Sequence, residues 1–308
     1  MAAQHANAFE ALLIDDGFEG EVLPYEPMSR HTTFRIGGPA RFYIRAQTLR
    51  ALSTLVAHCQ ASAIPWVVVG KGSNLLVSDA GFDGVVIVLG EEFRTIHYDE
   101  ERSCFVVGGG ATLATLVQEA FKRAVAGLEF AVGIPGTVGG AVRMNAGSGK
   151  EHIGSRVASV TAFSHGKGLV RYLASDIDWS YRACSIPEDE IVVECEIAVA
   201  PALASYIRGK MEGSLNARKK SQPINLPSCG SVFKNPDGAF AGELIEGAGL
   251  KGLRNGWAMV SQFHANFIVN AGDASAADVY GLIRIIQAKV FEKYGIQLQP
   301  EVKFLGFA

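Results

Sequence analysis

Apolar residues recur at helical spacing in two segments of the N-terminal half of the chain. Each segment follows a threonine, Thr48 or Thr112, and threonine is typical of a helix N-cap. The apolar positions of the first segment are Leu49, Leu52, Val56 and Cys59, and those of the second are Leu113, Leu116, Val117, Ala120 and Phe121. The spacing predicts two amphipathic helices, the second of which should end at Gly127.

A third helical pattern lies near the C-terminus. It begins at Ser275, which pairs with Asp278 as a capping box, and Gly295 marks its end. The face predicted to be buried carries Val279, Leu282, Ile283, Ile286, Val290 and Phe291. A further helix is predicted over about 201–222, where it ends in the basic segment ARKKSQP.

Short apolar runs between these helices predict strands. WVVVG at 66–70 is typical of a buried strand, and VVIVL at 85–89 and CFVV at 104–107 are further strands. Longer β-like runs follow at 155–164 and 191–200, and EVKFLGF forms a last short strand. At 308 residues, two or three domains are expected.

Charge and composition narrow the class of partner. The net charge is −3 with no basic block, which argues against a nucleic-acid surface and favours a small-molecule partner. The uncharged run at 130–142 is too short and too broken by Gly and Pro to span a membrane. The acidic residues of the first 20 positions argue against a secretory signal, and five cysteines without a CxxC pair are expected to be free thiols, so we expect a cytoplasmic protein.

Two stretches are rich in glycine, VGKGSNLLVSD at 69–79 and GIPGTVGGAVRMNAG at 133–147. Small residues let the main chain approach a bulky anion such as a diphosphate, although tight turns alone would also explain them. Leu75 stands where a third Rossmann glycine belongs, and Glu151 stands where a P-loop needs Ser or Thr. A standard dinucleotide fold and a P-loop ATPase are therefore disfavoured.

Five further motifs occur in order around these stretches: HTTFRIGGPARF (31–42), SYRAC (180–184), CGSVFKNP (229–236), HANFIVN (264–270) and QPEVKF (299–304). Over about 22–306 the chain resembles the UDP-N-acetylenolpyruvoylglucosamine reductase (MurB) family, flavoenzymes of peptidoglycan precursor synthesis. The segment 240–261 is short, so the chain resembles the shorter type, which has no tyrosine lid loop.

This resemblance implies an α+β enzyme with the vanillyl-alcohol-oxidase-type (PCMH-like) FAD-binding fold. The implied domains are a first FAD-binding subdomain over 1–90, a second over 91–200, and a substrate-binding domain over 201–298. Residues 299–308 would return to the active site. The implied cofactors are FAD and NADPH, and no metal is expected.

The resemblance also implies which residues hold the flavin. Those of the glycine-rich stretches are Gly70, Lys71, Gly72, Ser73, Asn74, Gly133, Ile134, Pro135, Gly136, Gly139, Gly140 and Ala141. Those expected nearby are Thr33, Arg35, Gly37, Arg143 and Asn145. Taken singly, Arg35 would also suit a surface ion pair, and Asn145 would suit a turn with unusual backbone angles.

The implied reaction adds hydride to C3 and a proton to C2 of UDP-N-acetylglucosamine enolpyruvate. No side chain delivers hydride, so a flavin that NADPH reduces must do so. The resemblance assigns Ser231 as the proton donor, Arg182 as the electrophile that holds the carboxylate, and Glu301 as a third catalytic group. Cys229 is the rival donor, because a thiol is more acidic than a hydroxyl. In an extended loop it would face the same side as Ser231, although a small buried apolar role suits it better.

Residues implied to bind the substrate are Tyr181, Arg218, Gln222, Lys234, Asn235, His264 and Asn266. His264 would equally suit a satisfied core histidine. Two other functions remain open from the residues: a flavin-dependent alcohol oxidase of the same fold, and a non-catalytic protein that binds a nucleotide sugar.

Overall fold

The computed structural model describes residues 9, 11, 13, 17–149 and 151–307. The chain forms two compact units, each built from three separate stretches. Unit 1 comprises Met1–Pro24, Phe42–Gly70 and Gly84–Asn216, and unit 2 comprises Tyr25–Arg41, Lys71–Asp83 and Ala217–Ala308. The three-domain division stays a prediction. The expectation of no secretory signal falls mostly on residues outside the described ones.

Most residues of a first sheet belong to unit 1. Its order is β1-β2-β5-β3, with bounds Gly20–Pro27, Pro39–Ala46, Phe82–Leu89 and Trp66–Val68. Helix α2, Leu49–Ala61, packs its apolar side into the same core as Ile44 and Ile87. The Thr48 hydroxyl accepts a hydrogen bond from Ala51 N, which confirms the predicted helix start. The predicted buried strand at 66–70 is shorter, and all three of its residues are only half-buried.

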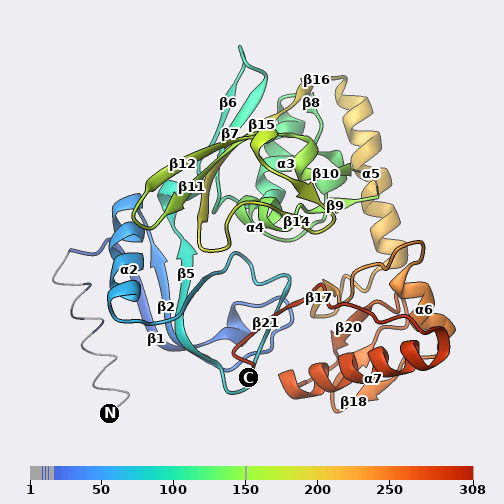
Figure 1. Cartoon of the computed structure of the whole chain (residues 1–308). Helices are drawn as coiled ribbons and strands as arrows, with labels where there is room; N and C mark the ends of the chain where they lie inside the picture. The colour runs from blue at the N-terminus through green and yellow to red at the C-terminus, as the bar shows by residue number, and fades with distance from the viewer. Residues whose placement is uncertain (1–8, 10, 12, 14–16, 150, 308) are drawn as a thin grey trace. The chain divides into compact units, whose positions relative to one another are not determined.

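The second sheet of unit 1 is antiparallel, with the order β12-β11-β15-β7-β6. Its strands are Gly168–Leu173, Val157–Ser164, Ile191–Ala198, Cys104–Gly108 and Ile96–Asp99. Helices α3, Leu113–Lys122, and α4, Val138–Arg143, share one hydrophobic core with this sheet. Figure 1 shows both helices beside it.

Two details of the α3 prediction are wrong. The helix ends at Lys122 and not at Gly127, because Ala124 takes a positive φ of 51° and the chain continues as β8, Val125–Ala126, which pairs with β16, Ala200–Pro201. Phe121 is only half-buried: it lies outside the buried core cluster of this unit, and the guanidinium of Arg208 lies 5.6 Å from the centre of its ring.

Short elements complete unit 1 and lead out of it. Two small hairpins are β9–β10, Gly147–Ser148 with Glu151–His152, and β13–β14, Trp179–Ser180 with Ala183–Cys184. Among the described residues, the 3₁₀ turns of unit 1 are η2 to η5, at Glu91–Arg94, Glu129–Ala131, Ile153–Ser155 and Ala174–Asp176, and η1, Met28–Arg30, belongs to unit 2. Helix α5, Ala204–Ser221, confirms the helix predicted at 201–222; Ile207 is its one buried residue.

Unit 2 contains a four-stranded sheet with the order β17-β20-β19-β18. Its strands are Ser228–Ser231, Phe267–Asn270, Ala258–Val260 and Arg254–Asn255. Helices α6, Ala241–Gly247, and α7, Ala276–Tyr294, pack into the core of this unit (Figure 1). A separate parallel pair joins β4, Leu75–Val77, to β21, Lys303–Leu305, which is shorter than the predicted final strand.

The predicted capping of α7 is confirmed. Ser275 and Asp278 form the reciprocal capping box, and Gly295 ends the helix with a left-handed φ of 68°. The prediction that Phe291 is buried is wrong, because its side chain is 54% exposed. Val290 takes the inward position at that turn, and the next residue is rotated by about 100°. Within the described part of the chain, no helix is both long and apolar enough to cross a membrane.

Candidate active site

Ser231 ends strand β17 in unit 2, where the strand is irregular. Its register against β20 shifts between Ser228 and Ser231, and Gly230 between them has φ 79°. Such a φ interrupts the side-chain alternation of an extended strand. Cys229 is 3% exposed and belongs to the hydrophobic core of unit 2, whereas Ser231 is half-buried. The segment is therefore not regularly extended, which was the condition for both side chains to face the same side.

The buried position of Cys229 also makes it a poor acid. Burial, with a smaller contribution from the nearby Glu301 carboxylate, raises the pKa of its thiol to about 12. At neutral pH a thiol with this pKa stays protonated and is not a reactive thiolate. Cys229 is therefore a small, buried residue that packs in the core, which was the second of the two expectations for it.

The segment that carries Glu301 lies beside the residues after Ser231. Glu301 N donates to Val232 O at 2.7 Å, and Lys234 N donates to Gln299 O at 2.9 Å. The predicted catalytic serine and glutamate are thus on neighbouring segments of unit 2, tied by main-chain hydrogen bonds although they are far apart in the sequence.

Residues predicted to hold the flavin secure both of these segments. The Thr33 hydroxyl donates to Ser228 O at 2.7 Å, at the start of the strand that carries Ser231. The Asn74 carboxamide donates to Glu301 O at 3.0 Å, and Asn74 O accepts from Lys303 N at 3.0 Å. In unit 2, therefore, the motifs of the first 80 residues are integral to the site around Ser231 and Glu301.

Glycine is required at two positions of these early motifs. A Cβ on Gly72 would lie 2.2 Å from His31 O, and one on Gly37 would lie 2.8 Å from Val77 Cβ; both glycines have a positive φ. Arg35 is exposed with φ 57°, Lys71 is exposed, and Ser73 is half-buried.

In unit 1 the two glycine-rich stretches meet. A Cβ on Gly70 would lie 2.5 Å from the Thr137 hydroxyl. Gly139 of the second stretch also donates from its N to Gly109 O, directly after β7, at 2.8 Å. The sequence prediction omits Thr137, although its place before VGG is an N-cap signature; its hydroxyl accepts from Gly140 N at the start of α4. Gly70, Gly133 and Gly140 are exposed, so their main chain is open to a bulky ligand. These residues fit a flavin nucleotide.

The side chains of Arg143 and Asn145 are engaged within unit 1. The Arg143 guanidinium donates to Ile186 O at 2.7 Å and also to Glu190 O, and burial lowers its pKa. The Asn145 carboxamide hydrogen-bonds to Ser180 O and to two further groups. The cofactor-binding role of these two residues stays a prediction, and their side chains already bind protein groups.

Arg182 occupies the turn of the β13–β14 hairpin. Ser180 pairs with Ala183, so Tyr181 and Arg182 form a two-residue loop, in which Arg182 has φ 60°. The guanidinium lies 5.0 Å from the centre of the Tyr181 ring, which is close enough for a cation–π contact. Tyr181 is 51% exposed and Arg182 is half-buried, so both side chains are at least partly accessible to solvent.

The predicted substrate residues of unit 2 differ in their burial and in the hydrogen bonds that their side chains make to other protein groups. Asn266 is 4% exposed and binds Phe233 twice, accepting from its N at 2.9 Å and donating to its O at 2.8 Å. His264 accepts from Asn266 N and packs against Phe267, and burial lowers its pKa. Asn235 accepts from Ala241 N at the start of α6. Lys234, Arg218 and Gln222 are half-buried.

Replacing Asn266 with alanine should destabilise the protein markedly. Two buried main-chain groups of Phe233 would lose their partner, and each such loss costs about 1–3 kcal/mol. The measurement is the shift of the urea unfolding midpoint. Asn235→Ala is the matched control, because Asn235 also accepts a hydrogen bond from a main-chain N–H, that of Ala241, but its side chain is exposed, so its loss should shift the midpoint less. Equal shifts would contradict the role assigned to Asn266.

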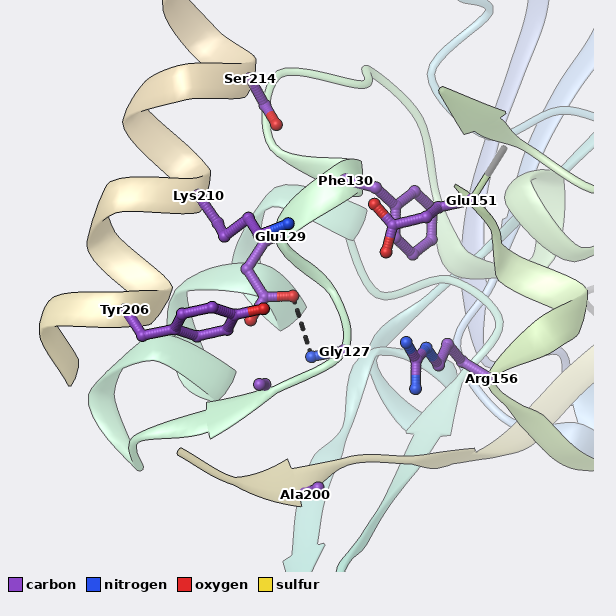
Figure 2. A pocket seen from close by; sticks show the side chains of 10 residues that line it. Gly127, Glu129, Phe130, Glu151, Arg156, Ala200, Tyr206, Lys210 and Ser214 are labelled. Atoms are coloured by element: carbon purple, nitrogen blue, oxygen red, sulfur yellow. Dashed lines mark hydrogen bonds between the residues drawn. The ribbon is translucent and has the colours of Figure 1, made fainter. Parts of the chain in front are cut away.

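A hollow of about 140 Å³ lies beside α5 in unit 1 (Figure 2). Its lining is of mixed charge, with Glu129 and Glu151 against Arg156 and Lys210. Glu129 accepts a hydrogen bond from Gly127 N at 2.9 Å, drawn as a dashed line in Figure 2. The lining contains none of the predicted site residues.

Comparison with known proteins connects these sites to a family. A family model described as "UDP-N-acetylenolpyruvoylglucosamine reductase, C-terminal domain" matches residues 222–305, which contain Ser231 and Glu301. A model described as "FAD binding domain" matches residues 40–172, which contain both glycine-rich stretches. The predicted α+β, FAD-binding fold is confirmed.

Individual relatives match over nearly the whole length. The UDP-N-acetylenolpyruvoylglucosamine reductase of Heliobacterium modesticaldum is 43% identical over 291 residues, 94% of this chain and 92% of its own. That of Bacillus pumilus is 39% identical over 290 residues, 93% of this chain and 95% of its own. The crystal structure of UDP-N-acetylenolpyruvylglucosamine reductase (MurB) from Thermus caldophilus is similar with a TM-score of 0.80 and 37% identity, covering 94% of this chain and 99% of that one. The chain therefore belongs to the UDP-N-acetylenolpyruvoylglucosamine reductase family and is an FAD-binding oxidoreductase.

Proposed function

We propose that the protein reduces UDP-N-acetylglucosamine enolpyruvate to UDP-N-acetylmuramate with NADPH, in the cytoplasm, as a step of peptidoglycan precursor synthesis. The observation that carries the proposal is the joining of the Ser231 and Glu301 segments in unit 2 by the 2.7 Å bond from Glu301 N to Val232 O. A reductase that must protonate a carbon needs a donor and a second group to restore it, and these two residues supply both.

The roles of the side chains follow from the charge that the reaction develops. FAD, when bound, supplies the hydride that adds to C3. Negative charge then grows on the substrate carboxylate, and Arg182, a permanently charged planar fork, holds it. Ser231 donates the proton that adds to C2, and Glu301 takes part in restoring the serine hydroxyl.

Binding roles are proposed for the remaining residues. Gly70 and the glycines of 133–140 let the flavin diphosphate approach the main chain. Lys234, Gln222 and Arg218 bind the sugar nucleotide, with Tyr181 beside Arg182. The segment 240–261 holds α6, β18 and β19, which supports the shorter type without a lid loop.

The two half-reactions test this function in one experiment. Under anaerobic conditions, NADPH should bleach the yellow flavin, and UDP-N-acetylglucosamine enolpyruvate should restore its colour. Recovery with oxygen alone would favour the alternative of a flavin-dependent alcohol oxidase. A protein that stays colourless after incubation with FAD would favour the non-catalytic nucleotide-sugar binding protein.

Replacing Cys229 with alanine should leave turnover within about threefold of the original, because Cys229 is 3% exposed and packs in the hydrophobic core of unit 2, where its thiol is closed off from a ligand. Loss of the buried sulfur should still lower the free energy of unfolding by about 1 kcal/mol. Steady-state turnover and a urea titration measure the two effects. A fall in turnover of about a hundredfold would make Cys229 the donor instead of Ser231.

A further inference from the structure

The hairpin that carries Arg182 is too small to hold its own shape. Each of its strands, β13 and β14, has two residues. An isolated two-stranded hairpin is marginal in water even when it is longer than this one. Arg182 moreover sits at φ 60°, a left-handed conformation that an L-residue with a side chain adopts only at a cost in free energy. Groups outside the hairpin must therefore fix this turn.

Asn145 is the residue placed to do so. It is 4% exposed, and its carboxamide nitrogen donates to Ser180 O at 2.9 Å, directly before the turn. Its carboxamide oxygen accepts from Gly154 N at 3.1 Å and pairs with His152 Nδ1 at 2.9 Å. One buried side chain thus connects three segments: the end of the second glycine-rich stretch, the η4 turn and the Arg182 hairpin.

Packing around Asn145 leaves the hairpin little freedom. A Cβ on Gly154 would lie 2.4 Å from the indole of Trp179 and 2.9 Å from the Asn145 oxygen, so glycine is needed for the Trp179 ring to pack there. At the base of the hairpin, Asp178 N donates to the Ser185 hydroxyl at 2.9 Å, and Ser185 N donates to Asp178 O at 3.1 Å.

From these contacts we propose that Asn145 is a positioning residue for Arg182, which acts by holding Ser180 O and not by binding the cofactor. The proposal rests on the proposed function, in which Arg182 holds the substrate carboxylate. All the hydrogen bonds described for the Asn145 carboxamide are made to protein groups of unit 1, and the one to Ser180 is adjacent to the turn. A small displacement of the Arg182 guanidinium from a carboxylate that it binds through two parallel hydrogen bonds is enough to lose much of the stabilisation.

The test uses Asn145→Gly in the full-length, FAD-loaded protein. Asn145 has φ 40°, which glycine adopts without strain, so the substitution removes the carboxamide and keeps the backbone. We expect reoxidation by the sugar nucleotide to slow by about 10- to 100-fold. Flavin content and the rate of flavin reduction by NADPH should stay within about twofold, because neither step uses Arg182. Loss of flavin, or an equal slowing of both half-reactions, would make Asn145 a cofactor ligand and overturn the proposal.

A double-mutant cycle separates positioning from a general structural role. If Asn145 acts through Arg182, Asn145→Gly should have almost no further effect on reoxidation in an Arg182→Ala background. A full additional loss there would overturn the proposal. Asn255→Ala is the matched control, because Asn255 also donates one bond to a main-chain oxygen, Asp278 O at 3.0 Å, but it belongs to unit 2; it should not slow reoxidation selectively.

Amide hydrogen exchange tests the hydrogen bond from Asn145 to Ser180 O without any substrate. The amides of 178–185 should exchange faster in Asn145→Gly than in the original protein, whereas those of β11 should be unchanged. Unchanged exchange in 178–185 would overturn the proposal. If instead the original protein fails to reduce the sugar nucleotide while exchange responds as expected, the proposed function fails and the anchoring of the hairpin stands.

Discussion

Replacing Ser231 with alanine should slow reduction of the sugar nucleotide by about a hundredfold or more, the usual effect of removing a general acid. Reduction of the flavin by NADPH should stay nearly normal, since that step takes no proton from the serine. The two rates are measured separately, by anaerobic stopped-flow absorbance of the flavin. The expected signature is a flavin that bleaches at the original rate and regains its colour slowly.

Ser228→Ala is the matched control for this substitution. Ser228 begins the strand that Ser231 ends, and its carbonyl, which the substitution keeps, accepts the hydrogen bond from Thr33. The control should leave both half-reactions within a few-fold of the original. If Ser231→Ala slows both half-reactions equally, the serine is a structural or flavin-binding residue and its assignment as proton donor is wrong.

Replacing Arg182 with alanine should lower the rate of sugar-nucleotide reduction by about 10²- to 10³-fold, because the charge that develops on the carboxylate loses its partner. Arg182→Lys should recover only part of this loss. Lysine keeps the charge but cannot make the bidentate fork. Single-turnover reoxidation of the reduced flavin by the sugar nucleotide measures both variants.

Arg171→Ala controls for the loss of an arginine from unit 1. Arg171 is in an ion pair with Glu196 at 3.0 Å, and its side chain is 57% exposed. Glu196 keeps its ion pair with Arg102 at 2.8 Å when Arg171 is replaced, so the control should be close to the original in rate and stability. An Arg182→Ala protein with almost unchanged reoxidation would remove Arg182 from the mechanism and, with it, the reason for anchoring its hairpin.

Local patterns were sufficient to predict several helix ends. Thr48, Thr112 and Ser275 act through residues three positions away, so their capping is decided within one turn. The inward faces depend also on what packs against the helix. Phe291 fits the apolar spacing, yet the neighbouring Val290 faces the core, and Arg208 from α5 covers Phe121. Periodicity alone cannot choose between two adjacent apolar residues.

The motifs around Ser231 and Glu301 could be named from the sequence, but their mutual support could not. Thr33 reaches Ser228 across 195 residues, and Asn74 reaches Glu301 across 227. No local spacing predicts such pairs. The same limit applies to Cys229, which is buried in a strand that the positive φ of Gly230 interrupts, a feature that the apparent extension of the segment does not predict. From the sequence alone, Asn145 is consistent with a simple turn residue. Only the structure shows that its carboxamide hydrogen-bonds to Ser180 O and Gly154 N.

The assembly of unit 2 from three stretches sets the order in which the nascent chain completes it. Strand β4 emerges from the ribosome early, but its partner β21 lies near the C-terminus. The 227 residues between Asn74 and Glu301 take roughly 10–45 s to synthesise at ordinary translation rates. During that time β4 has an unpaired edge, which is the kind of surface on which chaperones act and aggregation begins. Truncation of the last few residues should therefore lower soluble yield more than the small size of β21 suggests.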